Sequence, residues 1–208
     1  MGHYVNPVTQ PRQPQHVKAT KRKEAIVIGS SLVRDVGVDL NNLGHEAISY
    51  TNPGCCITHI VHRIKYFVPR NYTGNVTLLR AGNDCEISGA EEVINMYEKL
   101  IESVKKQAPD CNLILTAIPP RPGSDFLKYK IGQVNCYLHY VAVHDENIDF
   151  LENVPDNSNL HFKHDNLHFN TFGRKLFSSR LSKLLTSRKT HAETPEGNFP
   201  WYPNRLPT

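Results

Sequence analysis

Short apolar runs alternate with longer amphipathic stretches through the middle of this chain. Brief, nearly continuous apolar runs bounded by Gly, Pro, Asn or Asp are typical of buried strands, whereas apolar residues spaced three and four apart are typical of helices. The pattern predicts strands at 25–28, 46–51, 75–80, 112–118 and 148–151. It predicts helices from 32 to about 43, over 57–67, from just after Ser88 through Val104, over 127–144 and over 172–185.

Strands and helices alternate five times in this interpretation. Such alternation predicts an α/β domain of three layers, in which a five-stranded, mainly parallel sheet lies between two layers of helices. We expect this domain to span residues 23–188. Residues 1–22, rich in Pro and Gln, are expected to form a flexible basic arm, and residues 189–208 a Pro-rich tail.

The first strand runs into the most informative junction of the chain. Residues 25–35 read Ala-Ile-Val-Ile-Gly-Ser-Ser-Leu-Val-Arg-Asp, which predicts a strand, a tight turn at Gly29 and a helix. A Ser directly before a helical pattern is an N-cap signal. The turn therefore holds Ser30 and Ser31 above the carboxyl end of a buried strand, where open α/β sheets bind their ligands. The N–H groups that open a helix also favour nearby negative charge, so a serine here could be a nucleophile.

Composition narrows the class of protein. The 208 residues carry 24 Lys and Arg against 20 Asp and Glu, a net charge of +4 that permits a nucleic-acid partner without requiring one. No apolar run is long enough to cross a bilayer, and the first residues do not have the pattern of a signal peptide. The five cysteines are odd in number and lack C-x-x-C spacing, which argues against a disulfide scaffold. We therefore expect reduced thiols and a cytoplasmic location.

Further polar residues follow the other predicted strands. Gly54 lies after the second strand, Asn83 after the third, and Asp165 and His168 lie in the loop after the fifth. Because the carboxyl ends of parallel strands meet at one edge of a sheet, these residues should converge on Ser31. The spacing of Asp165 and His168 puts both side chains on one side of a turn, where the carboxylate can orient the imidazole. The set predicts a Ser–His–Asp triad, with oxyanion donors from Ser31, Gly54 and Asn83.

Other chemistry is weaker in the sequence. Two groups of histidines have spacings seen in metal sites, His161 with His164 and His168, and His59 with His62, but no convincing carboxylate or Cys set accompanies them. We predict no metal and no cofactor. Ser30 is the neighbouring candidate for the nucleophile. Arg80 and Arg121, near strand ends, could contact an acidic substrate group or form solvated salt bridges.

Four stretches together resemble the sequence blocks of the SGNH/GDSL hydrolase superfamily: Gly29-Ser-Ser-Leu32, Gly54, Ala81-Gly-Asn-Asp84 and Asp165-Asn-Leu-His168. They occur in the order of the family and at comparable separations. The resemblance implies a flavodoxin-like sheet and hydrolysis of carboxylic esters without a cofactor. The chain departs from the family at Ser30, where Asp is usual, and at Ala81, where Gly is usual. Neither departure removes a catalytic group, although both bear on turn geometry and substrate preference.

A narrower resemblance comes from the stretches Ile28 to Asp35 and Leu79 to Asp84. They are similar to esterase-like domains in the first open reading frame of certain animal non-LTR retrotransposons. We expect a small ester, short-chain acyl or acetyl, or a lipid, as substrate. The alternative is a non-catalytic domain that binds RNA or lipid. Its RNA contact would come from basic flanks such as the cluster Lys18, Lys21, Arg22 and Lys23.

Overall fold

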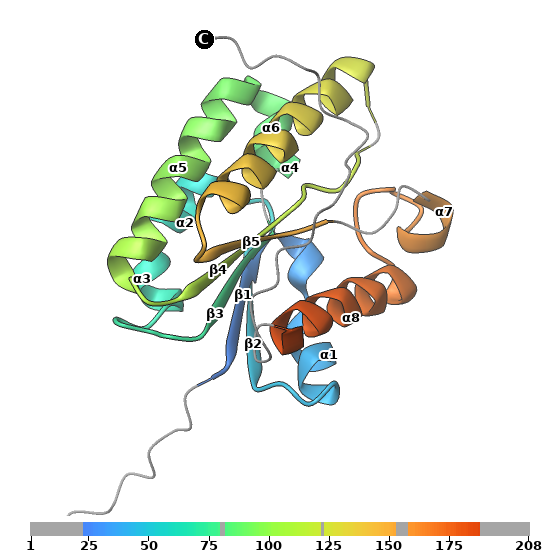
Figure 1. Ribbon diagram of the computed structural model, residues 1–208. Helices are drawn as coiled ribbons and strands as arrows, with labels where there is room; N and C mark the ends of the chain where they lie inside the picture. The colour runs from blue at the N-terminus through green and yellow to red at the C-terminus, as the bar shows by residue number, and fades with distance from the viewer. Residues whose placement is uncertain (1–22, 80–81, 122, 153–157, 188–208) are drawn as a thin grey trace, which may run out of the picture.

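Five parallel strands form one sheet at the centre of the molecule (Figure 1). The computed structural model describes residues 23–79, 82–121, 123–152 and 158–187. The strands are β1 (Ala25–Gly29), β2 (Ala47–Thr51), β3 (Asn75–Leu79), β4 (Asn112–Thr116) and β5 (Ile148–Leu151), and their spatial order is β2-β1-β3-β4-β5. The predicted fold class, with helices on both faces of a parallel sheet, is confirmed.

Alternation along the strands divides the core between the two faces of the sheet. Along β1, Ile26 and Ile28 belong to one apolar cluster, and Ala25 and Val27 belong to the other. All of β1 is buried, because successive side chains of a strand point to opposite faces and both faces here are covered.

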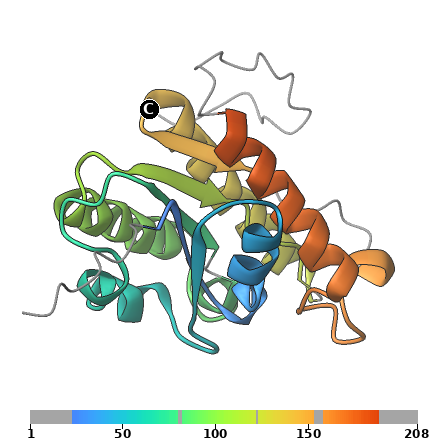
Figure 2. The same ribbon diagram turned by 90° about the horizontal axis from the view of Figure 1, so that it is seen from below.

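Two layers of helices cover the sheet, as Figures 1 and 2 show. The larger layer comprises α2 (Ile57–Val61), α3 (Ile64–Phe67), α4 (Gly82–Ile87), α5 (Ala90–Gln107) and α6 (Asp125–His144). The other face is covered by α1 (Val36–Asn42) and α8 (Thr171–Ser187). Two short elements, the 3₁₀ helix η1 (Ser31–Val33) and α7 (Ser158–His161), complete the described structure.

Several predicted helices differ from the observed ones. The helix expected from residue 32 is divided into η1 and α1, because Asp35 takes a left-handed backbone with φ 63°. The helix expected over 57–67 is divided into α2 and α3. The helix expected from just after Ser88 through Val104 begins at Ala90, with Gly89 as its N-cap, and continues to Gln107. α4 and α7 were not predicted, since such short helices show no apolar period.

The predicted arm and tail lie outside the described residues. Among the helices that the structure describes, none is long and apolar enough to cross a membrane.

The end of β1 leaves room for a hydrogen atom only. A Cβ atom on Gly29 would lie 2.6 Å from the carbonyl oxygen of Leu79 and would also meet the Val33 side chain. We expect Gly29→Ala to lower the free energy of unfolding by about 1–3 kcal/mol through overpacking. The matched control is Gly132→Ala in α6, where an added Cβ meets nothing within 4 Å and should raise stability by up to about 1 kcal/mol. Denaturant midpoints measure both changes, and an unchanged midpoint for Gly29→Ala would contradict the packing described here.

Candidate active site

The strand order reverses at β1, which has β2 on one side and β3 on the other. Gly29, the last residue of β1, is level with Thr51 of β2 and with Leu79 of β3. The loops that leave these three strands therefore begin at the same height. A reversal of strand order opens a crevice between the adjacent loops, and this is where α/β sheets bind ligands.

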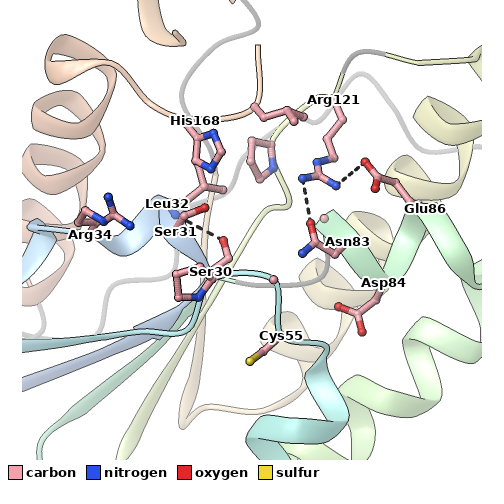
Figure 3. Close-up of a pocket in the computed structure, with 15 residues that line it drawn as sticks. Ser30, Ser31, Leu32, Arg34, Cys55, Asn83, Asp84, Glu86, Arg121 and His168 are labelled. Atoms are coloured by element: carbon pink, nitrogen blue, oxygen red, sulfur yellow. Dashed lines mark hydrogen bonds and ion pairs between the residues drawn. The ribbon is translucent and has the colours of Figure 1, made fainter. Parts of the chain in front are cut away.

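A pocket of about 380 Å³ lies at this crevice (Figure 3). Its lining includes Ser31, Gly54, Asn83 and His168. The structure thus brings four of the five predicted site residues to one cavity. The fifth, Asp165, is not in the lining but is hydrogen-bonded to His168. The roles of these residues are taken up under the proposed function.

The two serines of the first junction differ in what they contact. Ser30 is the N-cap of η1: its Oγ accepts a hydrogen bond from the N–H of Leu32 at 3.4 Å, and its own N–H donates to the carbonyl of Leu79 at 3.3 Å. Ser31 is the first residue of η1, and both serines line the pocket. Ser30 thus has a structural task in the turn. Within the described ranges, the hydroxyl of Ser31 makes no hydrogen bond.

Asp165 and His168 form a compact turn of the connection before α8. The Oδ1 atom of Asp165 accepts hydrogen bonds from the backbone N–H groups of Leu167, at 2.9 Å, and of His168, at 3.0 Å. Its Oδ2 atom lies 2.8 Å from Nδ1 of the His168 ring. Asn166, at φ 52°, supplies the left-handed residue that closes the turn, a conformation that Asn tolerates well.

These contacts settle the charge state of Asp165. The N–H groups of His168 and Leu167, followed by the imidazole of His168, hold the pKa of this carboxyl well below its usual range. An ionised carboxylate can only accept hydrogen bonds, so Nδ1 of His168 must carry the proton. In the neutral ring, Nε2 is then left as a base.

Ser31 and His168 line the same pocket from different elements (Figure 3). Their side chains are not hydrogen-bonded to each other in the described structure. Such contacts are often long before substrate binds and tighten in the reacting complex. The two side chains therefore share one cavity.

Asn83 lies in the first turn of α4. One end of its side-chain amide, the oxygen, is hydrogen-bonded. The Oδ1 atom accepts a hydrogen bond from Nη2 of Arg121 at 3.0 Å. Nη1 of Arg121 donates to Oε1 of Glu86 at 2.6 Å. In Figure 3 the guanidinium lies between the amide and the carboxylate. The sequence interpretation left Arg121 open between a substrate contact and a salt bridge, and the structure shows the salt bridge with Glu86.

The sequence interpretation gave Asp84 no role of its own, and the structure shows that its side chain is buried and hydrogen-bonded. It is 1% exposed, and its Oδ1 atom accepts a hydrogen bond from the N–H of Ile57 at 3.0 Å. Ile57 opens α2, directly after the loop of Gly54, which has φ 70°. Asp84 therefore ties α4 to the loop that carries Gly54. The signal that could have found it was its place beside Asn83.

The remaining sequence candidates do not assemble into a second centre. Among the described residues, no three His, Cys, Asp or Glu side chains come together as metal ligands. His161 is buried and stacks on Phe172, whereas His164 is exposed. None of the five cysteines, all of which lie in the described ranges, is in a disulfide, and burial raises the pKa of the Cys85 and Cys111 thiols to about 11. Arg80 and Ala81 lie outside the described residues.

Comparison with known proteins adds to this geometry. No family sequence model matches the chain, and no curated protein sequence matches it. Solved structures do match. A GDSL-like lipase from Bacteroides thetaiotaomicron aligns with a TM-score of 0.66 at 16% identity, covering 80% of this chain and 89% of that one. A member of the lipolytic G-D-S-L family from Veillonella parvula aligns with a TM-score of 0.64 at 19% identity, over 78% and 97%. A family 3 carbohydrate esterase from Clostridium thermocellum aligns with a TM-score of 0.62 at 16% identity, over 81% and 99%.

The chain thus has the α/β/α fold of the SGNH hydrolases. Its structural neighbours include lipolytic proteins and a carbohydrate esterase. At these identities the likeness establishes the fold. The activity is argued below from the site itself.

The contacts of Asp165 lead to a pH prediction. We expect its carboxyl to remain ionised below the ordinary aspartate pKa of about 3.9, because two backbone N–H groups donate to it. His168→Ala removes only the imidazole, so the pKa should remain lowered in that variant. ¹³C NMR titration of the carboxyl carbon measures this.

The sign of the linked stability change follows from the lowered pKa. A carboxyl whose folded-state pKa is lowered stabilises the fold at pH values above the unfolded pKa, and this contribution is lost as the pH falls through the folded value. A carboxyl of Asp165 that titrates near 3.9 in both proteins would show that the turn is not formed.

Proposed function

We propose that this protein is a serine hydrolase of carboxylic esters, with Ser31 as nucleophile, His168 as general base and acid, and Asp165 as the group that orients His168. The observation that carries the proposal is the Asp165–His168 hydrogen bond at the rim of the pocket that Ser31 also lines. A nucleophile and a base in one cavity, with the base oriented by a third group, are the requirements for covalent acyl transfer.

The chemistry follows from the contacts of each group. Oγ of Ser31 attacks the ester carbonyl while Nε2 of His168 takes its proton. His168 then donates this proton to the leaving alcohol, and the acyl group stays on Ser31. A water molecule, deprotonated by His168, releases the acid and restores the serine. Asp165 remains ionised throughout and stabilises the imidazolium that forms at each step.

Negative charge develops on the carbonyl oxygen in both steps. We propose that the backbone N–H groups of Ser31 and Gly54 and the Nδ2 group of Asn83 bind this oxyanion. The support is that all three residues line the pocket. In addition, Oδ1 of Asn83 is occupied by Arg121, which leaves the Nδ2 donors available. Preorganised donors of this kind are often the largest contribution to catalysis.

The substrate is proposed to be an ester with a short acyl group. Leu32 and Leu167 line the pocket beside Ser31 and His168, and they offer a limited apolar surface next to the reacting atoms. The structural neighbours are described as a lipase, a lipolytic protein and carbohydrate esterases. The alcohol could thus belong to a lipid or to a sugar, and we propose acetyl esters as the first class to test.

The retrotransposon resemblance suggests a setting for this activity, as the esterase domain of a first-open-reading-frame protein. The alternative of an RNA-binding domain depends on the basic cluster before β1, of which only Lys23 is described. It remains a prediction. RNA binding that weakens with salt in the full chain, and disappears without residues 1–23, would support it independently of any esterase result.

The nucleophile can be tested directly. Ser31→Ala should abolish hydrolysis of p-nitrophenyl acetate and labelling by a fluorophosphonate, because the variant lacks the hydroxyl that is proposed to attack the carbonyl. Ser30→Ala, which removes a helix cap worth about 1 kcal/mol, should keep the labelling. Activity assays and mass spectrometry of the labelled peptide measure both variants. Full turnover by Ser31→Ala would exclude the proposed mechanism.

The oxyanion donor has its own signature. Asn83→Ala should lower kcat by about 10²–10³-fold with little change in KM, because the amide acts mainly on the transition state. Asn147→Ala, on an exposed residue before β5, is the matched control and should leave both constants unchanged. A rise in KM at constant kcat would instead assign Asn83 to ground-state binding.

A further inference from the structure

The loop after β4 carries Arg121, whose side chain lies against α4 and lines the pocket. Arg121 is 14% exposed at its side chain, whereas its partner Glu86 is 47% exposed. The loop itself is held by α6: Asn135 accepts a hydrogen bond from the N–H of Ile118 at 2.7 Å and donates to its carbonyl at 3.1 Å. Pro119 and Pro120 then restrict the backbone up to Arg121.

The partners of Arg121 come from one face of one short helix. Asn83 and Glu86 are three residues apart in α4, a spacing that places side chains next to each other. The guanidinium reaches both, with one nitrogen for each. Gly82 makes this approach feasible, because a Cβ there would lie 3.0 Å from Nε of Arg121.

The chemistry of the two groups fixes the direction of the amide. A guanidinium can only donate hydrogen bonds, whereas an Asn amide has one accepting end and one donating end. The end of Asn83 that faces Arg121 must therefore be Oδ1. The Nδ2 group is then directed away from the guanidinium, as Figure 3 shows. Without Arg121 the amide could turn over and present its oxygen to the oxyanion.

We propose that Arg121, anchored by Glu86, is a positioning residue that holds Asn83 with its Nδ2 donors toward the reacting carbonyl. This inference rests on the proposed esterase function and deepens it. The guanidinium acts through Asn83, and its charge is partly neutralised by Glu86. A direct role in binding an anionic substrate group is the competing assignment.

The decisive experiment is a double-mutant cycle on p-nitrophenyl acetate. Arg121→Met should lower kcat with little change in KM, by a factor no larger than the roughly 10²–10³-fold expected for Asn83→Ala. In the Asn83→Ala background, Arg121→Met should change kcat by less than about twofold, since the residue through which it acts is gone. Arg121→Lys should restore part of the activity, and Glu86→Gln should have a smaller effect than Arg121→Met, because the Gln oxygen still accepts.

Two outcomes would overturn the proposal. The first is additivity, in which Arg121→Met costs the same factor with and without Asn83. The second is a KM effect confined to anionic esters, which would make Arg121 a substrate contact. The matched control is Arg70→Met, which removes an exposed arginine before β3, at the opposite end of the sheet from the pocket, and should leave both constants unchanged.

The positioning role of Arg121 can also be tested by a measurement that does not depend on esterase activity. The side-chain amide signals of Asn83 in ¹⁵N NMR should shift and broaden in Arg121→Met, while the backbone spectrum of the sheet stays in place. If the wild-type protein neither hydrolyses esters nor labels at Ser31, the esterase proposal fails. The amide signals then still decide whether Arg121 orders Asn83, and unchanged signals would overturn that.

Discussion

The site depends on the level register between β1 and its two neighbours. Gly29 is paired with Thr51 and with Leu79, so three loops leave the sheet at the same height and close to one another. A shift of one residue in either pairing would raise one loop by about 3.3 Å. That is more than the tolerance of a hydrogen bond. The buried apolar residues on both faces of β1 fix this register, since a slip would exchange the two faces.

Polar contacts then connect the loops to one another. Asp84 ties α4 to the start of α2, Arg121 ties α4 to the loop after β4, and Arg174 of α8 donates to Asp39 of α1 at 2.8 Å and to Asp35 at 3.0 Å. Arg174 and Asp39 form an ion pair whose side chains are 25% and 10% exposed, and breaking such a pair leaves a poorly solvated charge unpaired. The apolar core therefore sets the height of the loops, and these contacts set their spacing around the pocket.

The sequence allowed the sheet and much of the site to be predicted, because both depend on local pattern. Strands such as 25–28 are recognised from a short, continuous apolar run, and Asp165 and His168 lie within one turn. The division of the first helix at Asp35 was not predicted, since its left-handed backbone accompanies a contact with Arg174, 139 residues away. The short helix α4 and the hydrogen bond from Arg121 to Asn83 were also not predicted. A hydrogen bond between an arginine and an amide 38 residues earlier produces no periodic pattern in the sequence.

The Asp165–His168 pair has a consequence for how the site assembles. The three hydrogen bonds that the Asp165 carboxylate makes are contained within four consecutive residues, so this geometry depends on one turn. The serine turn is less local: Ser30 caps its own 3₁₀ helix, but its N–H also donates to the carbonyl of Leu79 on β3. The orientation of His168 by Asp165 is thus set by neighbouring residues, whereas its distance from Ser31 is set by distant parts of the chain. A substitution far from the pocket can therefore change the distance between Ser31 and His168 without touching the carboxylate that orients the imidazole.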